Sequence, residues 1–516
     1  MKILIANRGE IAVRIIRACR EIGLPTVAVY SDCDRDARHV READQAFHIG
    51  ASEAVKSYLR IDAIVDAAKR AGADAVHPGY GFLAENAAFA RACGDAGLTF
   101  IGPSADAIAL MGSKTAARAA AIDAGVPVVP GTAHPLDESV GVDEIARMAE
   151  SIGYPLLVKA VAGGGGKGMR TVDDRASLPA AVRSARSEAG SAFGDTAIYL
   201  ERRLERPRHI EIQLLGDRHG TVVPFVEREC SIQRRHQKVV EESPSIAVTP
   251  ELRRRIASAA AAVARAVNYS NAGTIEFLLD DNGAFYFLEM NTRLQVEHPV
   301  TEMVTAMDLV HWQIRIACGE KLTIDPERAL TPQGHAIECR IYAEDPDQGF
   351  LPSPGLIRGL RPAAGPGVRD DSGVSVGYTV PVFYDSMIAK LVTWGETRDH
   401  AVRRMSRALG EYEVLGIQTT IPFFIWLMRQ REYVEGRYDT TYLDTLLASR
   451  NGRSFSEVTG EDEELASIAA ALDAYLRGRL ARYGPATAGA RARGPGAPAT
   501  GGVSWKDVAR REALRG

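Results

Sequence analysis

The sequence predicts a multidomain protein that combines α/β and α+β folds. Two observations support this prediction: short apolar strands alternate with helical periods over the first hundred or so residues, and a β-hairpin signal lies farther along. A chain of 516 residues has room for three or four domains with ample cores. The net charge of −4 gives no general nucleic-acid footprint.

The sequence contains neither a recognisable targeting signal nor cysteines at metal-binding spacing. No uninterrupted apolar stretch is long enough to cross a bilayer, and the opening MKILIANRGE lacks the long apolar core of a signal peptide. We therefore expect a cytoplasmic protein that has no membrane partner. The six cysteines have no metal-ligand spacing, so reduced and mostly buried thiols are expected.

The first element is the strand KILIAN, and a helical period over residues 10–22 follows it. Further strands are expected at TVAVYS, at 73–77 and at 98–101. This order predicts a doubly wound parallel sheet. A dinucleotide site would need GxGxxG after the first strand, but the chain offers NRGEIA with one glycine. This argues against an oxidoreductase.

A second unit begins with a helix near residues 111–114 and contains the strand PLLVKA, which runs into VAGGGGKGMR. Lys159 closes this strand just before the glycine run. Glycines let backbone N–H groups approach phosphate oxygens, and Lys159 and Lys167 can add charge. The run is not a P-loop, and a flexible hinge is an equally common explanation. Because Lys159 flanks the run, we favour the interpretation that it is a lid that closes over a bound phosphate.

The strand HIEIQLL alternates polar and apolar residues, so its polar side chains share one face: His209, Glu211 and Gln213. The segment SIQRRHQKVVEE then places Gln233, His236 and Lys238 within a few residues. Taken alone, a histidine in such a position is more often a hydrogen-bonded structural residue than a ligand.

A β-hairpin is predicted within residues 274–297. Asn282 and Gly283 separate two apolar runs, and this dipeptide favours a two-residue type I′ turn with fixed register. That register sets Glu276 directly opposite Glu289, where like charges repel. It also puts Leu278 and Phe287 beside the carboxylates, and it puts four side chains on the reverse face: Phe277, Leu279, Tyr286 and Leu288. Two buried anions in contact need a cation.

The strand is expected to continue so that five polar residues share one face: Glu289, Asn291, Arg293, Gln295 and Glu297. Oxygen ligands at one end of this row suit Mg²⁺. At the other end, Arg293 with Glu297 offers an anion clamp and a base. Burial beside the apolar hairpin can raise the pKa of Glu297. The alternative is a solvated strand whose charges have no function.

Segments along the chain closely resemble the biotin carboxylase family of ATP-grasp ligases: ANRGEIAVRIIRA, GYGFLAEN, KAVAGGGGKGMR, RPRHIEIQ, QRRHQKVVEESP, FLEMNTRLQVEHPVTE, GHAIECRIYAEDP and FLPSPG. The resemblance implies a Rossmann-like N-terminal domain at 1–113 and an ATP-grasp domain at 114–330 whose glycine-rich lid spans about 131–203. It also implies a C-terminal biotin carboxylase domain at 331–447 and leaves a helical, partly disordered tail at 448–516.

The same resemblance assigns roles to residues. It implies that the nucleotide is bound by Lys114, Lys159, the backbone of Gly165 and Gly166, Glu201, Leu204, His209, Gln233, His236, Glu276 and Leu288. Mg²⁺, with Mn²⁺ as an alternative, would be bound by Glu276, Glu289 and Asn291. Bicarbonate would be held by Lys238, Arg293 and the Val296 amide. Glu297 would deprotonate it, and Arg340 would stabilise carboxyphosphate and the enolate of biotin.

The resemblance implies ATP- and bicarbonate-dependent carboxylation of biotin. No AMKM-type biotin attachment sequence occurs, so biotin is expected on a separate carrier protein, with a separate carboxyltransferase subunit. The final acceptor is expected to be acetyl-CoA or propionyl-CoA, with pyruvate as the alternative. A different ATP-grasp ligase and a non-catalytic nucleotide-binding scaffold are more remote alternatives. A homodimer is implied by the resemblance alone. Arg202 stands where the family pattern suggests lysine, and no role is carried over to it.

The C-terminal tail has a different composition from the rest of the chain. Residues 457–473 contain six acidic and no basic residues, and apolar residues then recur at helical spacing: Leu465, Ile468, Leu472, Leu476 and Leu480. Residues 483–502 have the composition of a disordered linker, and a short helix is expected from Ser504. The tail is expected either to fold on its own domain or, through Trp505, to dock a carrier or carboxyltransferase subunit.

Overall fold

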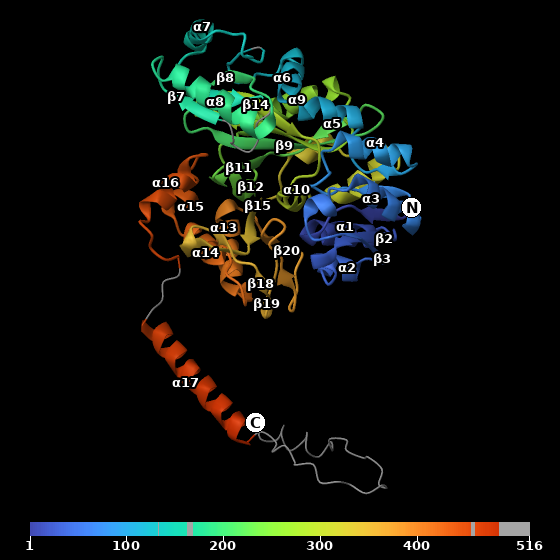
Figure 1. The fold of residues 1–516 in the computed structure, drawn as a ribbon, viewed down its shortest axis with the longest axis vertical. Coiled ribbons are helices and arrows are strands. Elements are labelled where there is room, and N and C mark those ends of the chain that lie inside the picture. Colours follow the sequence, from blue (N-terminus) through green and yellow to red (C-terminus); the bar gives the residue numbers. More distant parts are fainter. Residues whose placement is uncertain (133, 162–168, 456–459, 484–516) are drawn as a thin grey trace. The chain divides into compact units, whose positions relative to one another are not determined.

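The computed structural model describes residues 1–132, 134–161, 169–455 and 460–483 (Figure 1). The chain divides into two compact units, Met1–Phe455 and Ser456–Gly516. Within the described residues, no helix is long and apolar enough to span a bilayer. All six cysteines are free and four of them are buried, as expected.

The first unit begins with a five-stranded parallel sheet in the order β3-β2-β1-β4-β5. Its strands are β1 (Ile3–Ile5), β2 (Thr26–Ser31), β3 (Gln45–Gly50), β4 (Ala75–His77) and β5 (Thr99–Phe100). Four helices connect and cover them: α1 (Gly9–Glu21), α2 (Arg38–Glu42), α3 (Ile61–Ala71) and α4 (Ala87–Asp95). The predicted parallel sheet is confirmed. The sequence pattern missed β3, an edge strand with several exposed residues and therefore no apolar run.

Helices α5 (Ala105–Gly112) and α6 (Lys114–Asp123) lead into a small layer that we call the lid. Its three strands pair in the order β7-β6-β8. The lid elements are α7 (Val142–Ile152), β6 (Leu156–Ala160), β7 (Met169–Val172), α8 (Leu178–Phe193) and β8 (Ile198–Arg202). They lie together at the top of Figure 1 and share a core of their own, which includes Ile145, Val158 and Leu200.

A large antiparallel sheet follows, with strands in the order β14-β13-β9-β11-β12-β15-β22-β20 and β10 paired to β9. Its strands are β9 (Arg208–Gly216), β10 (Val222–Pro224), β11 (Arg228–Arg234), β12 (Gln237–Ser243), β13 (Asn271–Leu279), β14 (Phe285–Asn291), β15 (His335–Tyr342), β20 (Val368–Ser372) and β22 (Met387–Gly395). Strands β12 and β15 join the middle and C-terminal parts of the chain edge to edge.

Helices and short ladders complete the first unit. The helices are α9 (Pro250–Ala266), α10 (His298–Thr305), α11 (Leu309–Ala317), α12 (Pro326–Leu330), α13 (Arg398–Glu411), α14 (Ile421–Leu427), α15 (Arg431–Val434) and α16 (Tyr442–Ser449). The two-stranded ladders pair β16 (Glu344–Asp345) with β17 (Leu351–Pro352), β18 (Gly355–Leu356) with β21 (Thr379–Val380), and β19 (Gly359–Arg361) with β23 (Glu413–Leu415).

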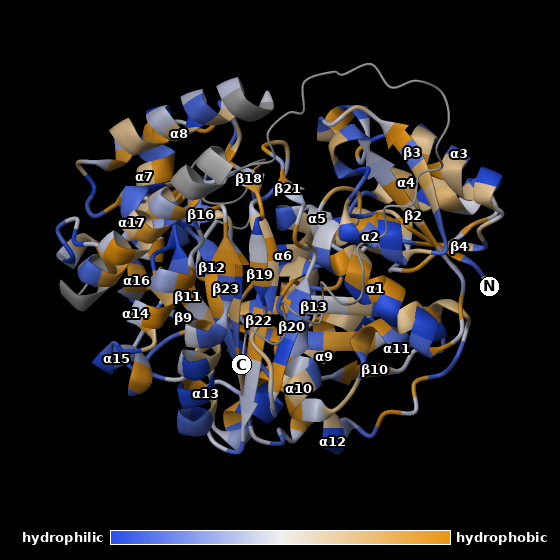
Figure 2. Cartoon of the chain, turned by 90° about the horizontal axis from the view of Figure 1, so that it is seen from below, coloured by the Kyte–Doolittle hydropathy of each residue, from blue (hydrophilic) through white to orange (hydrophobic). Residues whose placement is uncertain are grey.

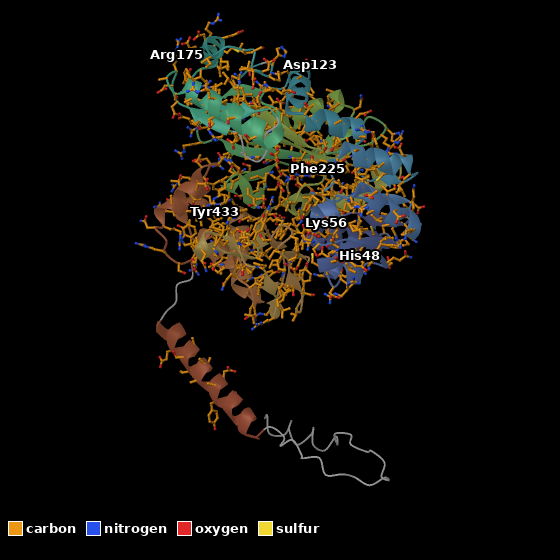
Figure 3. The ribbon with its side chains drawn as sticks, viewed as in Figure 1. His48, Lys56, Asp123, Arg175, Phe225 and Tyr433 are labelled. Carbon is orange, nitrogen blue, oxygen red and sulfur yellow. The ribbon has the colours of Figure 1, made fainter. Side chains whose placement is uncertain are left out.

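Several hydrophobic cores hold these layers together. Helices such as α1 and α8 carry both hydrophobic and hydrophilic residues (Figure 2), which is how an amphipathic helix covers a sheet. Phe225, after β10, and Tyr433, on α15, are fully buried in two different cores (Figure 3). The cores fix the strands, and the strands fix the polar side chains described below.

The second unit contains α17 (Gly460–Tyr483), in the region where a helix was expected. Its described apolar residues are exposed, with Leu465 at 65% and Leu472 at 55% of full accessibility. The linker and final helix that the sequence predicts lie beyond Tyr483, outside the described residues.

Candidate active site

A cavity of about 1040 Å³ lies between the lid and the large sheet. It is lined by these residues expected at the site: Lys114, Lys159, Glu201, Leu204, His209, Gln233, His236, Lys238, Glu276, Leu288, Glu289, Asn291, Arg293, Val296 and Arg340. Glu297 is fully buried next to this lining. Gly165 and Gly166 lie outside the described residues. Segments far apart in sequence therefore bring the predicted side chains to one place.

The hairpin of β13 and β14 forms one wall, and its register is reached differently from the prediction. The turn has three residues rather than two: the Asp280 N–H donates to the Ala284 carbonyl at 2.8 Å, which leaves residues 281–283 between them, and Gly283 adopts φ +79°. A register shift at Leu288 then restores the pairing of Glu276 with Glu289. The extra residue in the turn and the register shift at Leu288 thus compensate for each other.

The shift also changes which side chains share a face. Phe287 pairs with Phe277 and packs against it in the core, with ring centroids 6.5 Å apart, although it also lines the cavity. The prediction that Phe287 shares a face with the carboxylates is therefore wrong. Leu288, predicted on the reverse face, lines the cavity instead. A bulge inverts the alternation of a strand, and the alternating pattern of the sequence did not signal one.

The predicted row of five polar residues does not remain a strand. Strand β14 ends at Asn291, and Glu297 lies at the N-terminal end of α10. The side chains nevertheless converge, because the turn after β14 leads back to the same cavity. Asn291 Nδ2 and Gln295 Nε2 donate to Glu276 Oε1 at 3.0 and 3.2 Å.

Lys238 on β12 connects three carboxylates. Its Nζ donates to Glu211 Oε2 at 2.6 Å and to Glu276 Oε1 and Glu297 Oε1 at 2.7 Å each. Burial would lower the pKa of Lys238, but these three anions outweigh burial and raise it well above its usual value. The ammonium is therefore charged and joins the hairpin to the start of α10.

Glu297 is held as an anion. Burial alone would raise its pKa, but Lys238, Arg340 and Arg228 together hold the pKa of Glu297 well below its usual range. The expectation of a raised pKa is therefore wrong, because the sequence pattern showed the apolar hairpin but not these three cations. Glu297 is therefore ionised at neutral pH, which is the form that a general base requires.

Arg340 contacts this carboxylate, and Arg293 lines the same cavity. Arg340 Nη2 lies 3.0 Å from Glu297 Oε2, and its Nε donates to Glu241 Oε1 at 2.7 Å. Arg293 donates to Glu85 Oε2 and Gln295 Oε1 at 2.7 Å each. Each guanidinium is thus held by at least two oxygens, in the planar geometry that favours arginine over lysine.

The lid end of the cavity is cationic. Lys159 forms an ion pair with Glu201, and Arg118 Nη1 lies 3.5 Å from the same carboxylate. Burial lowers the pKa of Lys114. His209 Nδ1 lies 3.1 Å from Gln233 Nε2, and its Nε2 lies 3.0 Å from Glu276 Oε2. These groups could contact both phosphates and a base of a nucleotide.

The opposed carboxylates fit a hard divalent cation. Glu276 is buried but Glu289 is exposed, so the prediction of two buried anions is wrong for Glu289. Partial desolvation, and then the neighbouring Glu276, raise the pKa of Glu289, so a positive ion between the two would relieve their repulsion. Asn291 turns its Nδ2 toward Glu276, while its Oδ1 accepts from Arg293 Nη2 at 3.0 Å. Ligation by the Asn291 oxygen would need the amide turned over.

Sequence reasoning missed several supporting residues. Glu85, from the N-terminal part, accepts from the backbone of Thr292 at 2.8 Å as well as from Arg293. Arg228 is fully buried and paired with Glu211. The charged pattern of VVEE contained Glu241 but gave no sign of its contact with Arg340, because that pairing depends on a strand a hundred residues away.

A lid sheet facing a carboxylate-bearing hairpin across a polar cavity defines an ATP-binding enzyme of the ATP-grasp class. Three family models match successive stretches: "Biotin carboxylase, N-terminal domain" at 1–108, "Carbamoyl-phosphate synthase L chain, ATP binding domain" at 113–325 and "Biotin carboxylase C-terminal domain" at 338–445. The chain belongs to the biotin carboxylase family, and it is an ATP-dependent ligase.

Individual relatives are similar over most of the chain. A pyruvate carboxylase subunit of Methanothermobacter thermautotrophicus is 50% identical over 493 residues, which cover 93% of this chain and 99% of the relative. Biotin carboxylase 1 of Bacillus subtilis is 52% identical and covers 86% and 98%. The biotin carboxylase domain dimer of Hydrogenobacter thermophilus 2-oxoglutarate carboxylase, crystallised with MgADP, ADP and bicarbonate, gives a TM-score of 0.83 at 47% identity and covers 88% and 99%.

Proposed function

We propose that this protein carboxylates biotin held on a separate carrier protein, using ATP and bicarbonate and passing through carboxyphosphate. One observation supports this most directly: Lys238 contacts both Glu276, on the hairpin proposed to face the nucleotide, and Glu297, which also accepts from Arg340. A single cation thus links the place where a phosphate would be activated to the place where an anion would be deprotonated.

The chain's own residues would divide the work as follows. Lys114 and Lys159 bind phosphates, while Glu201 and Leu204 border the adenine. Arg293, Lys238 and the Val296 amide hold bicarbonate, and Glu297 takes its proton. Arg340 stabilises carboxyphosphate and the enolate of biotin, because its fork stays charged and binds oxygen in two places. Every predicted catalytic group would thus act in or beside one cavity.

Glu276, Glu289 and Asn291 would hold Mg²⁺, or Mn²⁺ in its place. When bound, the ion neutralises charge on the phosphates that the attacking anion must approach. The lid would keep water away from carboxyphosphate, because carboxyphosphate decomposes in water. Gly165 and Gly166 are proposed to contact phosphates through their backbone.

The test is ADP formation by the purified protein with Mg²⁺, ATP, bicarbonate and free biotin. We expect turnover that needs bicarbonate and increases with biotin. ADP formation independent of bicarbonate would point to another ATP-grasp ligase. Absence of ADP formation under all these conditions would point to a non-catalytic scaffold.

We propose acetyl-CoA or propionyl-CoA as the final acceptor, reached through a carrier protein and a carboxyltransferase subunit. Pyruvate is a second candidate, favoured by the pyruvate carboxylase relative from Methanothermobacter, which matches 93% of this chain. Co-purification of the native partners and their identification by mass would separate the two. A homodimer is proposed, because the Hydrogenobacter relative is described as a dimer. A cytoplasmic location is also proposed.

A further inference from the structure

Glu338 is a fully buried carboxyl group beside the site, and the catalytic proposal does not use it. It lies on β15 two residues before Arg340, so the two side chains share one face of the sheet. Within the described part of the chain, neither of its carboxyl oxygens has a hydrogen-bond partner. An ionised carboxylate in that position would be very costly, whereas a protonated one would not.

Glu241 faces Glu338 across the β12–β15 ladder. Directly opposed residues on antiparallel strands have Cβ atoms about 5 Å apart. One oxygen of Glu241 accepts from Arg340 Nε, but its Oε2 is buried and has no partner among the described residues. Three buried oxygens of the two neighbouring carboxyl groups are therefore unsatisfied, and one proton on Glu338 would let two of them share a hydrogen bond.

Among the described residues, the two cations near Glu338, Lys390 and Arg340, are each engaged by other oxygens. The titratable and charged groups near it, taken by element, are Glu241 on β12, Arg340 on β15, Lys390 on β22, and Glu297 and His298 where α10 starts. Lys390 Nζ donates to the Val296 carbonyl at 2.9 Å and lies 3.2 Å from Glu10 Oε1.

The electrostatics agree with this geometry. Burial raises the pKa of Glu338 well above its usual value against the opposing charge of Lys390, and the negative charge of Glu241 adds to the rise. Burial also raises the pKa of Glu241 to about 7, against the opposing effect of Arg340. Two adjacent acids that are both hard to ionise behave as a pair that retains one proton.

We propose that Glu338 is protonated in the active protein and donates its O–H to Glu241, which in turn holds the guanidinium of Arg340. Glu338 is thus a positioning residue that acts through Arg340, and the proton stays on the pair throughout the reaction. Its effect on turnover rests on the proposed biotin carboxylation, whereas its protonation does not.

The variants Glu338→Gln and Glu338→Leu separate hydrogen bonding from shape. Glutamine keeps a donor and cannot ionise, whereas leucine has a similar volume and no donor. We expect Glu338→Leu to lose about tenfold in biotin-dependent kcat, the effect of one hydrogen bond to a charged group. Glu338→Gln should recover most of that loss. Equal loss in both variants would overturn the positioning role.

Infrared difference spectroscopy at neutral pH tests the proton directly on the whole chain. The C=O stretch of a protonated carboxylic acid should be present in the wild type and lost in Glu338→Gln. Glu10 has a raised pKa of about 7, so Glu10→Gln identifies any contribution from that second buried acid. A band that Glu338→Gln leaves intact would overturn the inference, even if Glu338→Leu fails to fold. Absence of bicarbonate-dependent turnover in the wild type would instead contradict the proposed function.

Discussion

Glu297 shows how neighbouring charges can reverse the effect of burial on a single residue. The group is fully buried, yet its pKa falls, because the attraction of Lys238, Arg340 and Arg228 outweighs burial. We expect Glu297→Gln to lower bicarbonate-dependent turnover by about 10²- to 10⁴-fold, the usual contribution of a general base. Steady-state ADP formation would measure this, and calorimetric titration with an ATP analogue would show whether nucleotide still binds. Turnover within a few-fold of the wild type would contradict the role.

Glu289 offers a second test at the residue scale. Removing one of two opposed carboxylates should weaken metal binding, so Glu289→Gln should need about ten times more Mg²⁺ for half-maximal turnover. Asp281→Asn, an exposed aspartate in the turn of the same hairpin, is the matched control and should keep the wild-type requirement. A similar shift in both variants would mean that general charge, rather than ligation, is responsible.

Residue types were easier to predict from the sequence than their contacts. The pairing of Glu276 with Glu289 was predicted from the local hairpin signal, although the turn length and the register of the strand were both predicted wrongly. The sequence could not reveal the contact of Glu85 with Arg293 or that of Glu241 with Arg340, because those contacts join segments that only the tertiary fold brings together. For the same reason the direction of the Glu297 pKa shift could not be predicted.

Among the structural elements, β13 depends on one close approach. A Cβ added to Gly273 would lie 2.6 Å from the Tyr269 ring, and that tyrosine is held by a hydrogen bond from its hydroxyl to the Ala272 carbonyl at 2.8 Å. Gly273→Ala should therefore cost about 1–3 kcal/mol of stability through overpacking.

Thermal unfolding of the variant measures this cost. Gly94→Ala is the control, because Gly94 lies in α4 with open space around it and alanine favours helix by about 1 kcal/mol. Gly273→Ala as stable as the wild type would show that the ring moves away cheaply.

Elements with strong periodicity could be predicted, whereas irregular ones could not. The strand HIEIQLL places its isoleucines in the core as the alternation implied. The bulge at Leu288 could not be foreseen, because a single extra residue leaves no compositional trace. The correct pairing of Glu276 therefore rested on two compensating errors, in the turn and in the strand.

At the scale of the whole molecule, acid should destabilise the fold. Burial lowers the pKa of His39 to about 4 and that of His77 to about 3. Because both folded-state values lie below the unfolded value of about 6.5, the stabilisation is complete above pH 6.5 and lost as the pH falls toward 4 and 3. Each histidine thus accounts for a loss of about 3–5 kcal/mol in the free energy of unfolding once the pH is below its folded-state pKa. Calorimetry from pH 7 to 4 should show a steep fall that is shallower in His39→Gln; equal slopes would contradict this origin.

The division of the chain into two units gives another molecular prediction. All described site residues belong to Met1–Phe455, so a chain ending at Phe455 should keep the bicarbonate-dependent turnover of the full-length protein. Deleting only 484–516 and measuring assembly with native partners would separately test the tail, where unchanged assembly would argue against docking. Loss of turnover on truncation at Phe455 would show that the second unit supports the site.

Strands β12 and β15 are neighbours in one continuous sheet, with Glu241 and Glu338 meeting at their junction. Cutting the chain near residue 330 would strip β12 of its neighbour and expose the unpaired N–H and C=O groups of residues 240–243, which invites edge-to-edge aggregation. Engineers who exchange modules between relatives should therefore transplant both halves as one cassette, because neither the solubility nor the arginine geometry would survive a junction placed there.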